Sequence, residues 1–179
     1  MASQTWVTVL NTDNSQASGA ALNTSVALTD ISPTPNLVLP ANFLQKGSIL
    51  RIKASGFFST TGTPTLLLGA YLGGVAGVAL GATGATVTAS GAVTLPWDLE
   101  YEGIVRATGV SGSIMGNGIV HLGTSLAALS VIPIPATAIA AVTRDTTAVQ
   151  AVTIGAQWGA SAAANTITCT KFIVESKGI

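Results

Sequence analysis

The sequence contains very little charge. Only 8% of its 179 residues are Asp, Glu, Lys or Arg, and 7 basic residues balance 7 acidic ones. Average proteins carry roughly a quarter charged residues. Without a basic field the chain has no means of holding a phosphate backbone, so nucleic acid is not an expected partner. Solubility must come from Thr, Ser, Asn and Gly at the surface, from a partner that covers the surface, or from a membrane.

Cysteine and histidine each occur once, as Cys169 and His121. One cysteine excludes an intramolecular disulfide and a cysteine-based metal cluster, and one histidine excludes a His-rich metal site. Any Ser-His-Asp triad would have to use His121. The nearest serine motif, Gly-Ala-Ser-Ala-Ala at 159–163, lacks the final glycine and follows the histidine, whereas elbow hydrolases place the serine first. We therefore predict no catalytic residue, no metal ligand and no cofactor, and we expect the protein not to be an enzyme.

Asp98, Glu100 and Glu102 form the densest cluster of ionisable groups in the sequence. Residues two apart on a strand share a face and lie roughly 6.5–7 Å from one another. Such a row suits a paired-carboxylate hydrolase or a calcium site, or it is a solvated strand face with Arg106 as a nearby counter-charge. No second acidic cluster completes a site, so we favour the solvated face.

Two long segments contain no Asp, Glu, Lys or Arg, one between Lys53 and Asp98 and the other between Arg106 and Arg144. Their lengths alone permit membrane spans. Both are interrupted by proline, and neither has an aromatic belt or a flanking Lys/Arg cluster. The start of the chain has no basic region followed by an apolar run, so we expect no secretory signal. These features indicate a soluble β protein that is made in a cytoplasm and has no membrane partner.

Helical periodicity is hard to find, whereas period-two alternation and short apolar bursts bounded by Gly, Pro, Asn and Thr recur along the whole length. This pattern is typical of many short strands joined by turns. We therefore predict an all-β chain. The expected strands are Thr5–Leu10, Ser25–Asp30, Asn36–Leu39, Ser48–Ser59, Thr65–Leu72, Val75–Ala82, Trp97–Thr108, Ser113–Leu122, Leu126–Ile132, Ala138–Val142, Ala148–Gln157 and Thr166–Ser176.

Alternation also assigns faces to the two clearest strands. In the strand expected at 97–108, most residues of one face are apolar, and the acidic residues lie on the other face. In the strand expected at 48–59, the apolar set that begins at Leu50 lies opposite Arg51 and Lys53. A shift of one residue would bury both cations, so we expect the register to be firm.

The number and spacing of the strands predict an antiparallel β-sandwich of two sheets, and a jelly roll accommodates this many strands without long unpaired edges. Residues 11–19 are polar and turn-rich, so we expect 1–21 to form an N-terminal arm and 22–179 to form the sandwich domain. Apolar side chains early in the arm alternate in a way that suits adding a strand to a neighbouring sheet. These candidate partner-binding residues are Trp6, Val7, Val9 and Leu10.

Three segments carry a resemblance to a known group of proteins. They are LPANFLQKGSILRIKASGFFSTTGTPTLLLGAYLGG, LPWDLEYEGIVRATGVSGSIMGNG and TTAVQAVTIGAQWGASAAANTITCTKFIVES, in this order. In that pattern a Pro-Ala-Asn-x-Leu turn precedes a Gly-led strand, a Leu-rich strand ends in Gly-Gly, and a Trp-led acidic strand runs into a Gly-x-x-Gly turn. Over about 36–176 the chain resembles small jelly-roll structural proteins from the virions of tailed bacteriophages.

The resemblance implies an assembly and a role. Such domains are typically homotrimeric and occur as head decoration proteins, head fibres and tail-associated proteins. Because the chain has no long fibrous extension, we predict a decoration protein on the capsid surface of the virion, assembled in the bacterial host cytoplasm, whose partner is the major capsid protein. The alternatives are a tail-associated or receptor-binding protein that recognises a host glycan and, in a different class, a small carbohydrate-binding or hydrolytic sandwich.

The low charge independently favours a homotrimer. A monomer with so few charged residues would leave apolar strands such as Leu126–Ile132 and Ala138–Val142 partly exposed. Contact between copies would cover them.

Overall fold

The computed structural model describes residues 7–12, 22–23, 25–33 and 37–178 of the chain. All regular structure in these residues is β-strand, which confirms the all-β prediction. The strands are β1 (Val7–Thr12), β2 (Leu22–Asn23), β3 (Thr29–Asp30), β4 (Leu37–Leu39), β5 (Ile49–Ser59), β6 (Thr65–Leu72), β7 (Val78–Ala82), β8 (Thr86–Val87), β9 (Leu95–Ala107), β10 (Ser113–Ser125), β11 (Ala128–Ile134), β12 (Val142–Thr143), β13 (Gln150–Trp158) and β14 (Thr166–Lys177).

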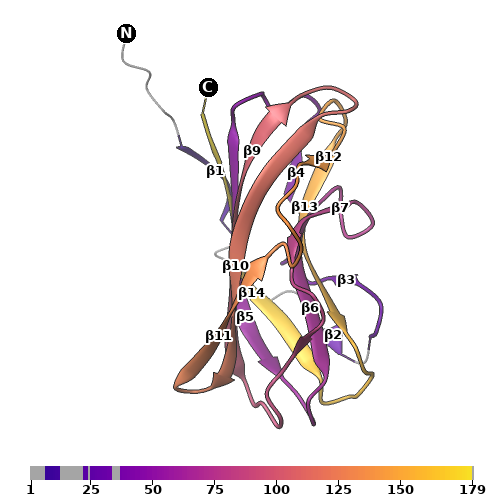
Figure 1. Ribbon diagram of the computed structural model, residues 1–179, viewed down its shortest axis with the longest axis vertical. Helices are drawn as coiled ribbons and strands as arrows, with labels where there is room; N and C mark the ends of the chain where they lie inside the picture. The colour runs from indigo at the N-terminus through magenta and orange to yellow at the C-terminus, as the bar shows by residue number, and fades with distance from the viewer. Residues whose placement is uncertain (1–6, 13–21, 24, 34–36, 179) are drawn as a thin grey trace.

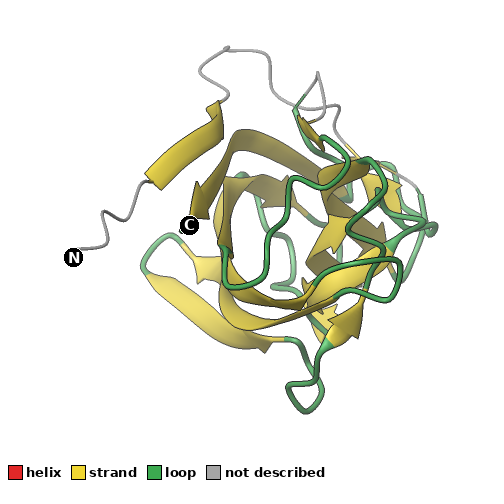
Figure 2. Cartoon of the chain, turned by 90° about the horizontal axis from the view of Figure 1, so that it is seen from above, coloured by secondary structure: helices red, strands yellow, loops and turns green. Residues whose placement is uncertain are grey.

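The strands form two antiparallel sheets that face each other (Figure 1). The eight-stranded sheet has the order β1-β14-β5-β9-β10-β11, with β2 beside β14 and β12 beside β10. The six-stranded sheet has the order β3-β13-β6-β7, with β4 beside β13 and β8 beside β6. Seen from above, the curved sheets wrap around a shared interior (Figure 2). The chain is thus a β-sandwich, as the sequence predicted.

The core is built from the alternating faces that the sequence assigned. Trp97, Leu99 and Tyr101 of β9 are buried, and so are the apolar residues of β5 from Leu50 to Phe58 that share one face. Burying a large apolar side chain contributes about 1.5–3 kcal/mol. The same cluster contains, from the six-stranded sheet, Leu66, Leu68, Ala70 and Leu72 of β6 and Val152, Ile154, Ala156 and Trp158 of β13.

Gly56 on β5 allows a core side chain to reach across its strand. The Trp97 indole N–H donates a hydrogen bond of 3.2 Å to the carbonyl oxygen of Thr168 on β14. Strand β5 lies between β9 and β14, and Gly56 pairs with Trp97 on one side and with Cys169 on the other. A Cβ atom on Gly56 would overlap the Thr168 carbonyl oxygen, so the position requires glycine.

The side chain of Tyr101 packs against two glycines of its own sheet. Gly103 of β9 and Gly116 of β10 are cross-strand partners, and the phenol oxygen of Tyr101 occupies the space that their side chains would take. Burial raises the pKa of Tyr101 to about 12, so the phenol is neutral near pH 7.

The strand expected at Ser25–Asp30 is shorter than the sequence indicated, because only Thr29–Asp30 pairs with a neighbour. The Ser25 hydroxyl accepts a hydrogen bond of 3.2 Å from the Ala27 N–H, and the Thr29 hydroxyl donates one of 3.0 Å to the Ala27 carbonyl. These local bonds replace a strand ladder with a turn.

The strand expected at Ala138–Val142 is also mostly absent, since only Val142–Thr143 pairs, with β10. The segment before it runs beside β7, where the Ala136 N–H donates a hydrogen bond of 3.0 Å to the Ala82 carbonyl. The connection therefore contacts the edge of the six-stranded sheet at Ala136 and does not extend either sheet before Val142.

Within the expected N-terminal arm, β1 pairs antiparallel with β14 of the same chain, from Val7 opposite Lys177 to Thr12 opposite Ile173. Val7, Val9 and Leu10 lie on this strand, whereas Trp6 and residues 13–21 lie outside the described residues. Binding of a partner by the arm stays a prediction.

Candidate functional site

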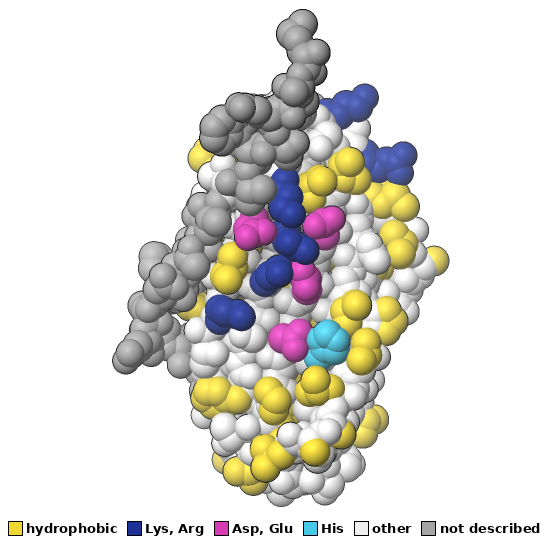
Figure 3. Space-filling view, turned by 90° about the vertical axis from the view of Figure 1, so that its left-hand side faces the viewer, with side chains coloured by type: hydrophobic (Ala, Val, Ile, Leu, Met, Phe, Trp, Pro, Cys, Tyr) yellow, Lys and Arg dark blue, Asp and Glu magenta, His cyan; other side chains and the backbone are white. Residues whose placement is uncertain are grey.

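The outer face of the eight-stranded sheet gathers ionisable side chains at its centre and apolar ones around them (Figure 3). Strand pairing aligns Lys171, Ser55, Asp98, His121 and Val131 in one row across β14, β5, β9, β10 and β11. Such rows place side chains from distant parts of the sequence about 5 Å apart. The row therefore begins with a basic residue, Lys171, contains the acidic Asp98 at its centre and ends with the apolar Val131.

The predicted acidic row lies outward, as the alternation indicated, and it is held by cations of β5. Arg51 lies 3.0 Å from Glu100 and 3.6 Å from Glu102, and Lys53 lies 3.2 Å from Glu100. Glu175 of β14 reaches Arg51 at 4.0 Å. The carboxylates are therefore members of a half-exposed ion-pair network.

The prediction that Arg106 supplies the counter-charge of the acidic row was wrong. Arg106 does not pair with the acidic row, and its Nη1 lies 3.0 Å from the Met115 sulfur on β10. Arg51 and Lys53 take that role because β5 lies directly beside β9, a long-range pairing that sequence spacing does not reveal.

His121 pairs with the acidic row from the other side. Its Nδ1 lies 2.8 Å from the Asp98 carboxylate, and both side chains are partly exposed. Cys169, the single cysteine, is fully buried. Within the described ranges no group of three or more His, Cys, Asp or Glu side chains is placed to hold a metal ion.

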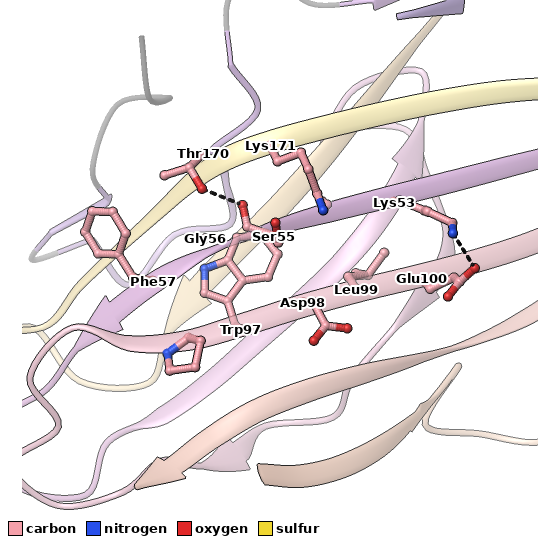
Figure 4. Close-up of a pocket in the computed structure, with 12 residues that line it drawn as sticks. Lys53, Ser55, Gly56, Phe57, Trp97, Asp98, Leu99, Glu100, Thr170 and Lys171 are labelled. Atoms are coloured by element: carbon pink, nitrogen blue, oxygen red, sulfur yellow. Dashed lines mark hydrogen bonds and ion pairs between the residues drawn. The ribbon is translucent and has the colours of Figure 1, made fainter. Parts of the chain in front are cut away.

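A hollow of about 530 Å³ opens where the row passes over β5, and we call it the Ser55 hollow. Ser55 is a small residue between Phe57 and Lys53, which form the two ends along β5 (Figure 4). Lys171 borders the hollow from β14 and Asp98 borders it from β9. Because β14 has a bulge beside Cys169, the consecutive residues Thr170 and Lys171 are both exposed. The Thr170 hydroxyl donates a hydrogen bond of 3.2 Å to the Ser55 carbonyl oxygen. Sequence reasoning missed this site.

The opposite border of the face is apolar. Strand β11 pairs with β10 on one side and, among the described strands, is the last of its sheet. Val131 is 61% exposed, Leu129 55% and Leu126, in the turn before the strand, 90%. With exposed Ile119 of β10 and Pro133 they form a surface that we call the β11 edge. It contains no Asp, Glu, Lys or Arg to keep other chains away.

Replacing Asp98, Glu100 and Glu102 by Asn, Gln and Gln is expected to leave the fold intact and to cost about 1 kcal/mol, because half-exposed ion pairs contribute little each. Denaturant unfolding measures the cost, and elemental analysis of both proteins is the control. A metal present in the unmodified protein and lost in the triple variant would contradict the interpretation of these carboxylates as an ion-pair network.

The described fold belongs to the broad class of two-sheet antiparallel β-sandwiches. No family model, no curated protein and no solved structure matches the chain. Among the residues the structure describes, no helix is long and apolar enough to cross a membrane.

Proposed function

We propose that this protein is a non-enzymatic structural protein of a bacteriophage virion, which assembles as a homotrimer and decorates the outer face of the capsid. The observation that carries the self-association part of the proposal is the β11 edge, an exposed and uncharged sheet border next to exposed aliphatic side chains. An exposed edge without charge or a covering loop is a template for another chain, and the single proline of β11, Pro133, removes only one backbone N–H from that strand. The virion role rests on the sequence resemblance described above.

Two features of the fold support the jelly-roll part of the proposal. Strand β5 pairs with β14 in one sheet, and the next strand, β6, pairs with β13 in the other. In a jelly roll, a long hairpin is rolled into a sandwich, so early strands pair with late strands in alternating sheets. The pairing of β5 and β6 follows this pattern.

The proposed role is mechanical. Copies that contact one another through the β11 edge and contact the major capsid protein through a second surface add buried area across the lattice, which resists internal pressure. Aliphatic contacts of this kind are little screened by ions, so the assembly is expected to persist at high salt.

The N-terminal arm is proposed as the element that attaches to the capsid protein. Deletion of residues 1–18 is expected to leave a folded domain that no longer binds particles. Strand β1 lies at the end of its sheet, so its loss removes no interior strand. Circular dichroism and particle co-sedimentation measure the two effects. Full occupancy by the truncated protein would place attachment on the sandwich instead.

Copy number tests the proposed location. Quantitative mass spectrometry of purified virions is expected to find hundreds of copies per particle for a protein that covers the capsid. A few copies would favour the alternative, a tail-associated or receptor-binding protein that recognises a host glycan, and complete absence from particles would overturn the proposal.

A further inference from the structure

The Ser55 hollow combines charged side chains, small polar residues and a partly exposed aromatic ring, and it lies across the outer sheet face from the β11 edge. We propose that this hollow binds one ring of a neutral saccharide. The inference goes beyond the proposed function, because a capsid protein and a tail protein can each carry such a site.

The charges that line the hollow cancel. Lys53 and Lys171 supply ammonium donors, and Asp98 and Glu100 supply carboxylate acceptors. Sugar hydroxyls both donate and accept hydrogen bonds, and bonds to ionised partners are roughly twice as strong as those between neutral groups. A polyanion or polycation finds no net attraction here, whereas a neutral polyol finds partners for both of its hydrogen-bonding roles.

Lys171 is a charged lining residue whose ammonium group takes part in none of the ion pairs among the described residues. Among the residues the structure describes, the ion pairs occupy Lys53 with Glu100 and Asp98 with His121, and none uses Lys171. In Figure 4 its side chain leans over Ser55 toward the β9 side of the hollow. A ring that sits over Ser55 therefore meets the Lys171 ammonium without first breaking an ion pair of the described network.

The hollow also offers an apolar wall. Phe57 is 38% exposed and is the cross-strand partner of Pro96, and both residues line one end of the hollow. Aromatic side chains that keep one face toward solvent pack against the C–H face of a sugar while its hydroxyls reach polar groups. The Lys53–Glu100 pair closes the opposite end (Figure 4).

The size and shape of the hollow fit a weak, repeated interaction. Its volume of about 530 Å³ lies within the range typical of small-molecule sites, which is roughly 300–1,000 Å³. A trough that is open to solvent binds one ring with an affinity in the millimolar range. Several hollows on one assembly would raise the avidity for a polysaccharide without any new contact.

The test is saturation-transfer NMR on the full-length protein with glucose, galactose, mannose, N-acetylglucosamine and glucuronic acid. At least one neutral sugar is expected to receive saturation from the unmodified protein. Ser55→Leu, which fills the floor of the hollow, is expected to abolish the transfer, and Lys171→Gln is expected to weaken binding about tenfold. Asn117→Leu is the matched control, since Asn117 is exposed on the same sheet face and outside the hollow, and it is expected to bind normally.

Circular dichroism and the sedimentation mass of each variant establish that fold and assembly are retained, so that a failure of binding is separate from a failure of the proposed assembly. Transfer to none of the neutral sugars, transfer to glucuronic acid alone, or equal transfer in the Ser55→Leu variant would each overturn the proposal.

Discussion

Val131→Lys is expected to convert the proposed homotrimer into monomers at micromolar concentration. In an isolated chain the new ammonium points to water from a position that is already exposed, so the fold is unaffected. In an interface that covers the β11 edge the same ammonium is buried without an anionic partner, at a cost of several kcal/mol in each copy. Sedimentation velocity measures the change in mass.

The matched control for this variant is Val110→Lys. Val110 is 73% exposed in the turn between β9 and β10, roughly 27 Å along β10 from His121, the cross-strand partner of Val131. It is expected to keep the assembly of the unmodified protein. An assembly that survives Val131→Lys would show that the copies meet through another surface.

Gly56→Ala is expected to destabilise the fold by about 3 kcal/mol and to lower the thermal midpoint by about 10 °C, compared at equal protein concentration. The added methyl group overlaps the carbonyl oxygen of Thr168 and approaches the Trp97 indole nitrogen to 3.0 Å, so the strand must shift and the buried hydrogen bond from the indole is lost. Differential scanning calorimetry measures both quantities.

Gly84→Ala is the control, because it measures the effect of a glycine-to-alanine change at a position where the added methyl group causes no overlap. The nearest atom to a Cβ at Gly84 is the Ala136 methyl carbon at 3.7 Å, which is ordinary van der Waals contact. The change is expected to alter stability by less than about 1 kcal/mol. If Gly56→Ala melted at the temperature of Gly84→Ala, the close approach of β5 and β14 would be refuted.

Local pattern was enough to predict most of the longer strands and the faces of β5 and β9. The acidic strand at β9 and the strand with Arg51 and Lys53 were assigned correctly, because a side-chain period of two is a property of the strand itself. Pattern failed where a hydrogen bond to a side chain replaces the ladder, as at Ser25. It also failed at the alanine-rich segment 138–142, which has the apolar composition of a strand but of which only Val142 pairs with a neighbour.

The site depends on strand order, which a single sequence does not contain. The Ser55 hollow needs β14, β5 and β9 to be neighbours in a fixed register, and those strands lie far apart in the chain. The counter-charges were missed for the same reason, since Arg51 and Glu102 are 51 positions apart in sequence and directly opposite in the sheet. The bulge that exposes both Thr170 and Lys171 is a second feature that alternation cannot foresee.

Self-association through the β11 edge is the central claim of this account, and sedimentation equilibrium of the full-length chain tests it most directly. At micromolar concentration the account predicts a mass three times that of the chain, which is 17.8 kDa, and the same mass at high salt. A single species with the mass of one chain at these concentrations would contradict the account.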